Sequence, residues 1–137
     1  MFATKKELGQ HWLHDDESLQ AMVDGIDLKK ADTVLEIGPG LGTLTTKLTD
    51  RARDVIAVEF DTDLARELVG RVPASNLHIV RQDILKYDLT QLPKHYKIAA
   101  NIPYYLTSNL LRTLCESTNP FSKASLLMQK EVAERVA

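Results

Sequence analysis

Short β-rich runs alternate with helical stretches along almost the whole sequence of 137 residues. The strands are expected at 33–37, 54–59, 77–80, 97–101 and 124–129, and the helices at 17–25, 43–51, 61–71 and 107–116, with one more beginning at Glu131. Strands that alternate with helices form right-handed βαβ crossovers, which place the strands parallel in one sheet. The alternation therefore predicts a doubly wound α/β domain with helices on both faces of the sheet.

The composition is that of a globular domain rather than of a membrane or secreted protein. Hydrophobic residues make up 44% and charged residues 26% of the chain, and no apolar run approaches the roughly 18 residues that a membrane span requires. Lys5, Lys6 and Glu7 interrupt any apolar region of a secretory signal. The single cysteine, Cys115, has no partner for an internal disulfide, and we expect it to be buried on the helix 107–116. These features predict a cytoplasmic protein with no membrane partner.

A glycine-rich turn, Glu36-Ile37-Gly38-Pro39-Gly40-Leu41-Gly42, follows the first predicted strand. Alternate glycines permit positive φ angles and let the backbone approach a ligand closely. Ligands of doubly wound sheets bind outside the carboxyl ends of the strands, where this turn is expected. Glu59 ends the second predicted strand about 20 residues further on, where a carboxylate can accept hydrogen bonds from ribose hydroxyls. The two features together predict a ligand that contains a nucleoside.

The details of this turn favour S-adenosylmethionine over a dinucleotide. The third glycine of the dinucleotide fingerprint would fall at Thr43, and Pro39 removes a backbone N–H that a pyrophosphate would use. S-adenosylmethionine contains ribose, adenine and a sulfonium group but no phosphate. Asp83 follows the third predicted strand and could accept a hydrogen bond from the adenine amine of this cofactor. By itself an aspartate in that place is more often a helix cap, but its position after the glycine turn and Glu59 favours the binding role.

The segment Asn101-Ile102-Pro103-Tyr104 ends the fourth predicted strand at the same edge of the sheet. An exocyclic adenine nitrogen is a poor nucleophile because its lone pair is delocalised into the ring. The side-chain oxygen of Asn101 and the carbonyl of Ile102 are acceptors that can bond its two hydrogens and aim the lone pair at a methyl group. Pro103 would fix the turn, and Tyr104 could stack on a base taken out of its helix. An isolated tetrapeptide of this kind is more often a turn with a core tyrosine, but the preceding cofactor motifs favour methyl transfer to adenine.

These motifs, in this order and spacing, resemble the ribosomal RNA adenine N6-dimethyltransferase family, and the resemblance covers the whole chain. Lys6–Leu13 is similar to the N-terminal motif that closes over the cofactor in that family, although Trp12 stands where phenylalanine is commoner and His11 where asparagine is frequent. Glu36–Gly42, Glu59, Asp83 and Asn101–Tyr104 match in turn. Leu127–Arg135 resembles the segment that favours the housekeeping small-subunit enzymes over their antibiotic-resistance relatives.

The resemblance implies a Rossmann-like class I S-adenosylmethionine-dependent methyltransferase fold and a role for each matching residue. Six residues are implied to contact S-adenosylmethionine and three to hold the target adenine: His11, Leu13, Gly38, Glu59, Asp83 and Asn101 for the cofactor, and Asn101, Pro103 and Tyr104 for the adenine. For His11 and Trp12, packing of an aromatic pair against the core is the alternative. The implied activity is dimethylation of N6 on two adjacent adenosines near the 3′ end of small-subunit, 16S-type ribosomal RNA during ribosome biogenesis. The expected partner is the immature small ribosomal subunit, and we expect a monomer that needs no metal.

The unclosed last helix and the resemblance predict that residues 1–137 are an incomplete methyltransferase domain, and the net charge agrees with this. The net charge of −2 counts against binding of a polyanion by this chain alone. The helix that begins at Glu131 has no residue that would end it, and the resemblance implies further strands and a small helical RNA-binding domain beyond Ala137. The expected fold is therefore truncated after the fifth strand, and the fragment by itself is expected to have little activity.

Two other functions are compatible with the same motifs. One is a large-subunit ribosomal RNA adenine N6-methyltransferase of the antibiotic-resistance type, against which the segment Gln129-Lys130-Glu131 argues by resemblance. The other is a ribosome-assembly or transcription-associated factor that keeps the fold and binds without catalysing. The complete Asn101–Tyr104 segment makes catalysis the favoured interpretation.

Overall fold

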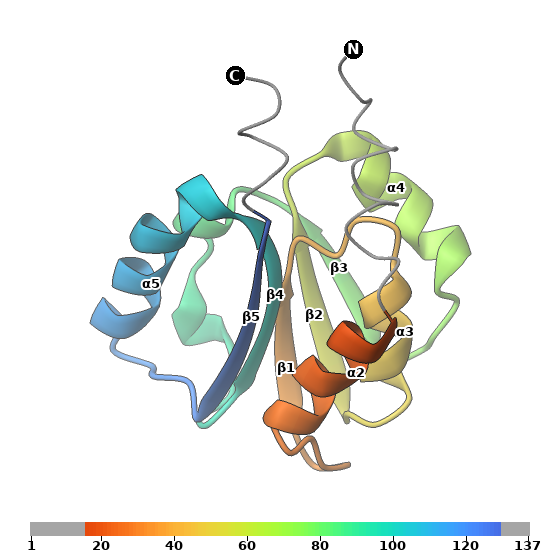
Figure 1. Cartoon of the computed structure of the whole chain (residues 1–137), viewed down its shortest axis with the longest axis horizontal. Coiled ribbons are helices and arrows are strands. Elements are labelled where there is room, and N and C mark those ends of the chain that lie inside the picture. Colours follow the sequence, from red (N-terminus) through yellow and green to blue (C-terminus); the bar gives the residue numbers. More distant parts are fainter. Residues whose placement is uncertain (1–15, 130–137) are drawn as a thin grey trace.

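The computed structural model describes residues 16–129, which alternate between helices and strands (Figure 1). The helices are α2 (Asp16–Gly25), α3 (Thr43–Thr49), α4 (Thr62–Arg71) and α5 (Thr107–Glu116). The strands are β1 (Thr33–Ile37), β2 (Asp54–Glu59), β3 (Leu77–Arg81), β4 (Lys97–Pro103) and β5 (Lys123–Gln129). Short 3-10 helices lie at η1 (Ile84–Lys86), η2 (Leu89–Gln91) and η3 (Tyr104–Leu106).

The strands form one parallel sheet in the order β3-β2-β1-β4-β5. The chain builds β1, β2 and β3 outward in one direction and then returns to add β4 and β5 on the other side of β1. The winding therefore reverses between β1 and β4. In doubly wound sheets the ligand lies at such a reversal, outside the carboxyl ends of the strands, so the fold places the candidate site above β1 and β4.

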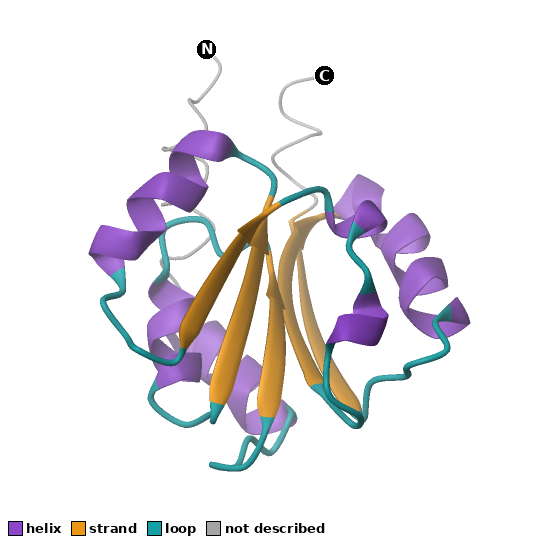
Figure 2. Cartoon of the chain, turned by 180° about the vertical axis from the view of Figure 1, so that it is seen from behind, coloured by secondary structure: helices purple, strands orange, loops and turns teal. Residues whose placement is uncertain are grey.

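Helices cover both faces of the sheet, as Figure 2 shows from behind. Side chains alternate between the faces along each strand, so Val34 packs with α2 and α3 on one face while Leu35 lies in the core on the other. The first face buries Leu19, Val23, Leu44 and Leu48 against the sheet, and α4 adds Leu68 over Ala57. The second face buries Leu110 and Leu114 of α5 together with residues of η1 and η2. Both cores are apolar, which leaves the strand ends to carry the polar groups.

The observed elements confirm the predicted α/β class, with differences at their ends. Asp61 caps α4 by accepting hydrogen bonds from the N–H groups of Asp63 and Leu64, at 2.9 and 3.1 Å. The predicted helix 43–51 ends at Thr49, and β4 continues to Pro103 instead of ending at residue 101. The expected burial of Cys115 is wrong, because this side chain is exposed. Leu110 and Leu114 face the core, and Cys115 lies one position further round the helix.

A buried ion pair joins the loop before β1 to the start of β4. Lys97 is only 7% exposed, and its Nζ donates to Oδ2 of Asp32 at 2.7 Å and to the backbone carbonyl of Asp27 at 2.6 Å. The N–H of Lys29 donates to the same Asp32 oxygen at 2.7 Å. These bonds fix the amino edge of the central strands, opposite the candidate site. Among the helices of residues 16–129, none has the length and apolar character needed to cross a bilayer.

Candidate functional site

The glycine turn between β1 and α3 adopts the backbone conformation that its sequence predicts. Gly38, Gly40 and Gly42 have φ angles of 69°, 56° and 90°. The N–H of Gly38 donates to the carbonyl of Val58 at 3.1 Å, which ties the turn to β2. A Cβ atom at Gly38 would lie 2.7 Å from the backbone carbonyl oxygen of Asn101. Only glycine lets the cofactor turn approach β4 so closely.

The carboxylate of Glu59 holds this turn in place from the end of β2. One oxygen accepts the N–H of Gly40 at 3.2 Å, and the other accepts the N–H of Asp61 at 3.0 Å. The side chain is only 8% exposed. Each carboxylate oxygen has a second lone pair, so the group can also accept from ribose hydroxyls. The structure thus gives Glu59 an organising role that its spacing alone did not predict.

Asp83 lies two residues beyond the carboxyl end of β3, the strand that pairs with β2. The backbone N–H of Gln82 donates to the Glu59 carbonyl at 3.0 Å, which joins the ends of β2 and β3. One oxygen of Asp83 accepts the N–H of Leu85 at 3.0 Å, so the residue caps η1. The capping interpretation is therefore correct for Oδ1 of Asp83. The other oxygen can still accept a hydrogen bond.

Glu36, the first residue of the glycine-turn segment, was not predicted from the sequence to be a site residue. Its side chain is 1% exposed, and its Oε1 accepts a 2.6 Å hydrogen bond from the hydroxyl of Thr45 in α3. Burial, opposed by the hydrogen bond from Thr45 and reinforced by the nearby charge of Glu59, raises the pKa of Glu36 to about 8. An acidic residue inside an otherwise apolar strand run was the available signal. The glycine turn thus lies between two buried carboxyl groups.

The Asn101–Pro103 segment extends β4 beyond its neighbour β1. The last pair between β1 and β4 is Ile37 with Ala100, whereas β4 stays paired with β5 as far as Pro103 and Gln129. The β1 side of this extension lies against the glycine turn, as the close approach of Gly38 to the Asn101 carbonyl shows. Asn101 is buried. The expected turn at Pro103 is thus the last residue of a strand, and the 3-10 helix η3 begins immediately after it.

Exposed aromatic side chains follow the strands at this edge. Tyr104 and Tyr105 begin η3 after β4 and are 54% and 75% exposed. Phe60 follows Glu59 at the end of β2 and is 67% exposed. Tyr104 is therefore not a core residue, and its exposure is compatible with stacking on a base. The sequence analysis did not single out Phe60 or Tyr105.

The whole chain, residues 1–137, matches the protein family described as ribosomal RNA adenine dimethylase. The chain belongs to this family. Among its curated relatives, the ribosomal RNA small subunit methyltransferase A of Clostridium botulinum is 38% identical over 139 residues, which cover 98% of this chain and 50% of that protein. The enzyme of the same name from Streptococcus gordonii is 42% identical over 144 residues, covering 99% of this chain and 50% of that protein. The chain thus spans about half the length of these relatives.

Solved structures of related methyltransferases share the fold. A dimethyladenosine transferase from Plasmodium falciparum is 35% identical with a TM-score of 0.75, and the match covers 90% of this chain and 45% of that one. The 23S rRNA methyltransferase ErmE is 30% identical with the same TM-score of 0.75, over 88% of this chain and 48% of its own. The domain therefore has the Rossmann-like fold of S-adenosylmethionine-dependent methyltransferases.

The strand-end residues of this dimethylase-family chain fit a cationic nucleoside cofactor. Oε2 of Glu36 is buried, and within residues 16–129 it has no hydrogen-bond partner. None of the described lysine, arginine or histidine side chains forms an ion pair with Glu36 or Glu59. A sulfonium group would supply the missing positive charge, and Glu59 and Asp83 supply acceptors for ribose and adenine. His11 and Leu13, which the resemblance also assigns to the cofactor, lie outside the described residues.

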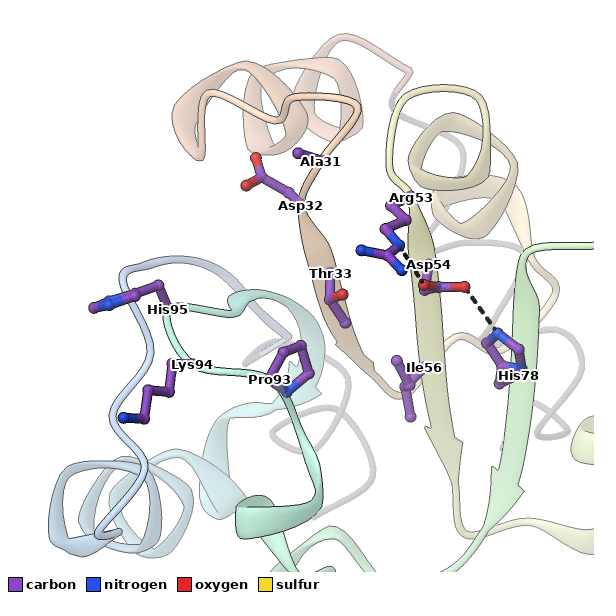
Figure 3. A pocket seen from close by; sticks show the side chains of 10 residues that line it. All are labelled: Ala31, Asp32, Thr33, Arg53, Asp54, Ile56, His78, Pro93, Lys94 and His95. Carbon is purple, nitrogen blue, oxygen red and sulfur yellow. Dashed lines mark hydrogen bonds and ion pairs between the residues drawn. The ribbon is translucent and has the colours of Figure 1, made fainter.

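A separate cavity of about 570 Å³ opens at the opposite, amino edge of the sheet (Figure 3). In it, Asp54 lies between the side chains of His78 and Arg53, with Oδ1 at 3.1 Å from Nε2 of His78 and Oδ2 at 3.6 Å from Nε of Arg53. The rest of the lining is Ala31, Asp32, Thr33, Ile56, Pro93, Lys94 and His95. Doubly wound sheets bind their ligands outside the carboxyl ends of the strands, so this cavity at the amino edge is not the candidate cofactor site. Within the described part of the chain no cluster of acidic, histidine or cysteine side chains could hold a metal ion.

Proposed function

We propose that this chain is the catalytic part of an enzyme that transfers methyl groups from S-adenosylmethionine to N6 of two adjacent adenosines near the 3′ end of small-subunit ribosomal RNA. The observation that carries the proposal is the close approach of Gly38 to the backbone of Asn101. A Cβ atom added at Gly38 would lie only 2.7 Å from the Asn101 carbonyl oxygen. It brings the turn that binds the methyl donor against the segment that holds the methyl acceptor. Family membership supports the reaction type.

Each strand-end residue has a separate task in this reaction. S-adenosylmethionine, when bound, supplies a methyl group made electrophilic by its sulfonium charge. Glu59 and Asp83 would hold the ribose and the adenine of the cofactor. Asn101 and the Ile102 carbonyl would accept hydrogen bonds from the N6 amine of the target base and aim its lone pair at the methyl group. Tyr104 would stack on the target base, which has left its helix.

The choice of a small-subunit substrate rests on the relatives. The curated relatives at 38–42% identity are named small subunit methyltransferases, whereas the large-subunit enzyme ErmE is 30% identical. The immature small ribosomal subunit is therefore the proposed partner. Because the chain covers half of these relatives, the activity is proposed for the full-length protein, acting as a monomer in the cytoplasm without a metal.

Single-turnover methylation by the full-length protein tests this function. Immature small subunits and large-subunit RNA are offered with labelled, saturating cofactor, and cofactor affinity is titrated separately. Tyr104→Ala should slow transfer to the small subunit roughly tenfold to a hundredfold, because a lost stacking contact costs ~1–3 kcal/mol, and should leave cofactor affinity nearly intact. Asn101→Ala should be slower still. Tyr105→Ala removes the neighbouring and more exposed ring and is the matched control.

The outcomes separate the three candidate functions. Methylation of large-subunit RNA alone would replace the proposal with the resistance-type activity. Cofactor binding without transfer to either RNA would make the protein a binding factor. Wild-type rates in Tyr104→Ala would remove the stacking role of this ring.

A further inference from the structure

Two carboxyl groups flank the glycine turn in the free protein. Glu36 is buried below the turn, where only Oε1 has a partner, the hydroxyl of Thr45 at 2.6 Å. Glu59 lies at the end of the neighbouring strand and accepts two backbone N–H groups of the cofactor edge. Two ionised carboxylates in one buried site repel each other, and each would lose its hydration.

No described cation compensates these charges. Glu59 on β2 is the charged group whose field reaches Glu36. Lys47, on the same helix as Thr45, lies in an ion pair with Asp16 at 2.9 Å. On β4 the residue paired with Glu36 is the uncharged Ala99, and Asn101, two positions further along the strand, is also neutral. Burial is the main cause that raises the pKa of Glu36. The hydrogen bond from Thr45 lowers this pKa and the repulsion by Glu59 raises it, and the result is about 8. At pH 7 roughly nine-tenths of the molecules therefore carry the proton on Glu36.

We propose that Glu36 is a neutral carboxylic acid in the cofactor-free enzyme and ionises when S-adenosylmethionine brings its sulfonium charge to the glycine turn. The O–H bond of Glu36 breaks, the electron pair stays on the carboxylate, and the proton passes to the buffer. The inference rests on the proposed cofactor. The thioether product, S-adenosylhomocysteine, has one positive charge fewer, so after methyl transfer Glu36 takes up a proton again. Glu36 therefore acts as a specificity-determining residue that favours the charged methyl donor over its product.

Calorimetric titration of the full-length protein in buffers of different protonation enthalpy counts the protons released. At pH 7 binding of S-adenosylmethionine should release up to about 0.9 proton more than binding of S-adenosylhomocysteine. Both ligands carry an amino group that can also release a proton. Taking the difference between the two ligands reduces the contribution of this amino group to the measured proton release. The affinity for S-adenosylmethionine should rise up to about tenfold per pH unit below pH 8 and level off above it.

Two variants test the assignment to Glu36. Glu36→Gln keeps the shape of the side chain without its titration, so the excess proton release and the preference for the charged ligand should both fall. Thr45→Val removes the hydrogen bond that favours ionisation, so the midpoint of the affinity curve should move to higher pH. Infrared difference spectra of the wild type should show the loss of a carboxylic acid band on binding S-adenosylmethionine, and Glu36→Gln should not show it.

The results distinguish this inference from the proposed function. Equal excess proton release in wild type and Glu36→Gln would overturn the role of Glu36, even if the enzyme binds its cofactor normally. If the midpoint of the curve of affinity against pH does not move in Thr45→Val, the role of Glu36 is also contradicted. Thr45→Val provides the test if Glu36→Gln does not fold. Absence of S-adenosylmethionine binding by the wild type would instead refute the cofactor assignment itself.

Discussion

Replacing Gly38 by alanine tests the contact that joins the cofactor turn to the methyl-acceptor segment. Gly38 has a φ of 69°, where an L-residue costs roughly 1–2 kcal/mol. The new Cβ would also lie 2.7 Å from the Asn101 carbonyl oxygen. Because that oxygen belongs to the backbone of β4, the turn and the strand must separate by several tenths of an ångström, and overpacking of this kind costs typically ~1–3 kcal/mol. The free energy of unfolding should therefore fall by roughly 2–5 kcal/mol.

The same substitution at Gly70 is the matched control. Gly70 lies in α4, has no atom within 4 Å of an added Cβ, and should gain up to ~1 kcal/mol from the higher helix propensity of alanine. Urea denaturation of the two full-length variants measures stability, and calorimetric titration measures affinity for S-adenosylmethionine. Gly38→Ala should be less stable and bind the cofactor more weakly, whereas Gly70→Ala should bind normally. If both variants unfold at the same urea concentration and bind the cofactor equally well, the inference that Gly38 is needed for close packing of the turn against β4 is refuted.

Two further substitutions test the edges of the sheet. Glu59→Ala should weaken cofactor affinity by ~1–3 kcal/mol and also lower the melting temperature, because the N–H of Gly40 loses its acceptor; unchanged affinity in a titration would remove Glu59 from the site. Asp32→Asn should lower the free energy of unfolding by roughly 1.5–3 kcal/mol, the usual range for a hydrogen bond to a charged group, since it leaves Lys97 buried without its carboxylate. Burial disfavours ionisation of Asp32, but the hydrogen bonds from Lys97 and the Lys29 N–H outweigh it and hold the pKa below its usual range. The wild type should therefore lose this stabilisation as the pH falls below 4, through the lowered pKa, and urea titrations of Asp32→Asn should not show that loss.

The sequence predicted the fold from local patterns, and it failed where contacts between distant segments decide the outcome. The β-rich runs around Val34 and Val55 and the helix caps such as Asp61 are local signals, and the structure confirms them. Cys115 was expected to be buried because apolar neighbours surround it in sequence, but the helix turns it away from the core. The acidic Glu36 inside an apolar strand run was a local signal, but its burial and its hydrogen bond to Thr45 depend on how α3 packs over β1, which the strand sequence does not show.

The carboxyl edge of the sheet is acidic, and this acidity limits which part of an RNA substrate could enter the proposed site. Glu59, Asp61 and Asp83 lie at the carboxyl ends of β2 and β3 or within two residues of them. This concentration of carboxyl groups suits a cationic methyl donor but repels the phosphates of RNA. A single adenine that has left its stack carries no charge, so it can enter alone while its phosphates stay outside. Tyr104, directly after β4, is exposed and is the ring that we propose would receive such a base; the attraction for the RNA backbone would then come from groups away from this edge. The charge distribution thus favours a flipped, neutral base as the methyl acceptor over any site on the sugar-phosphate backbone.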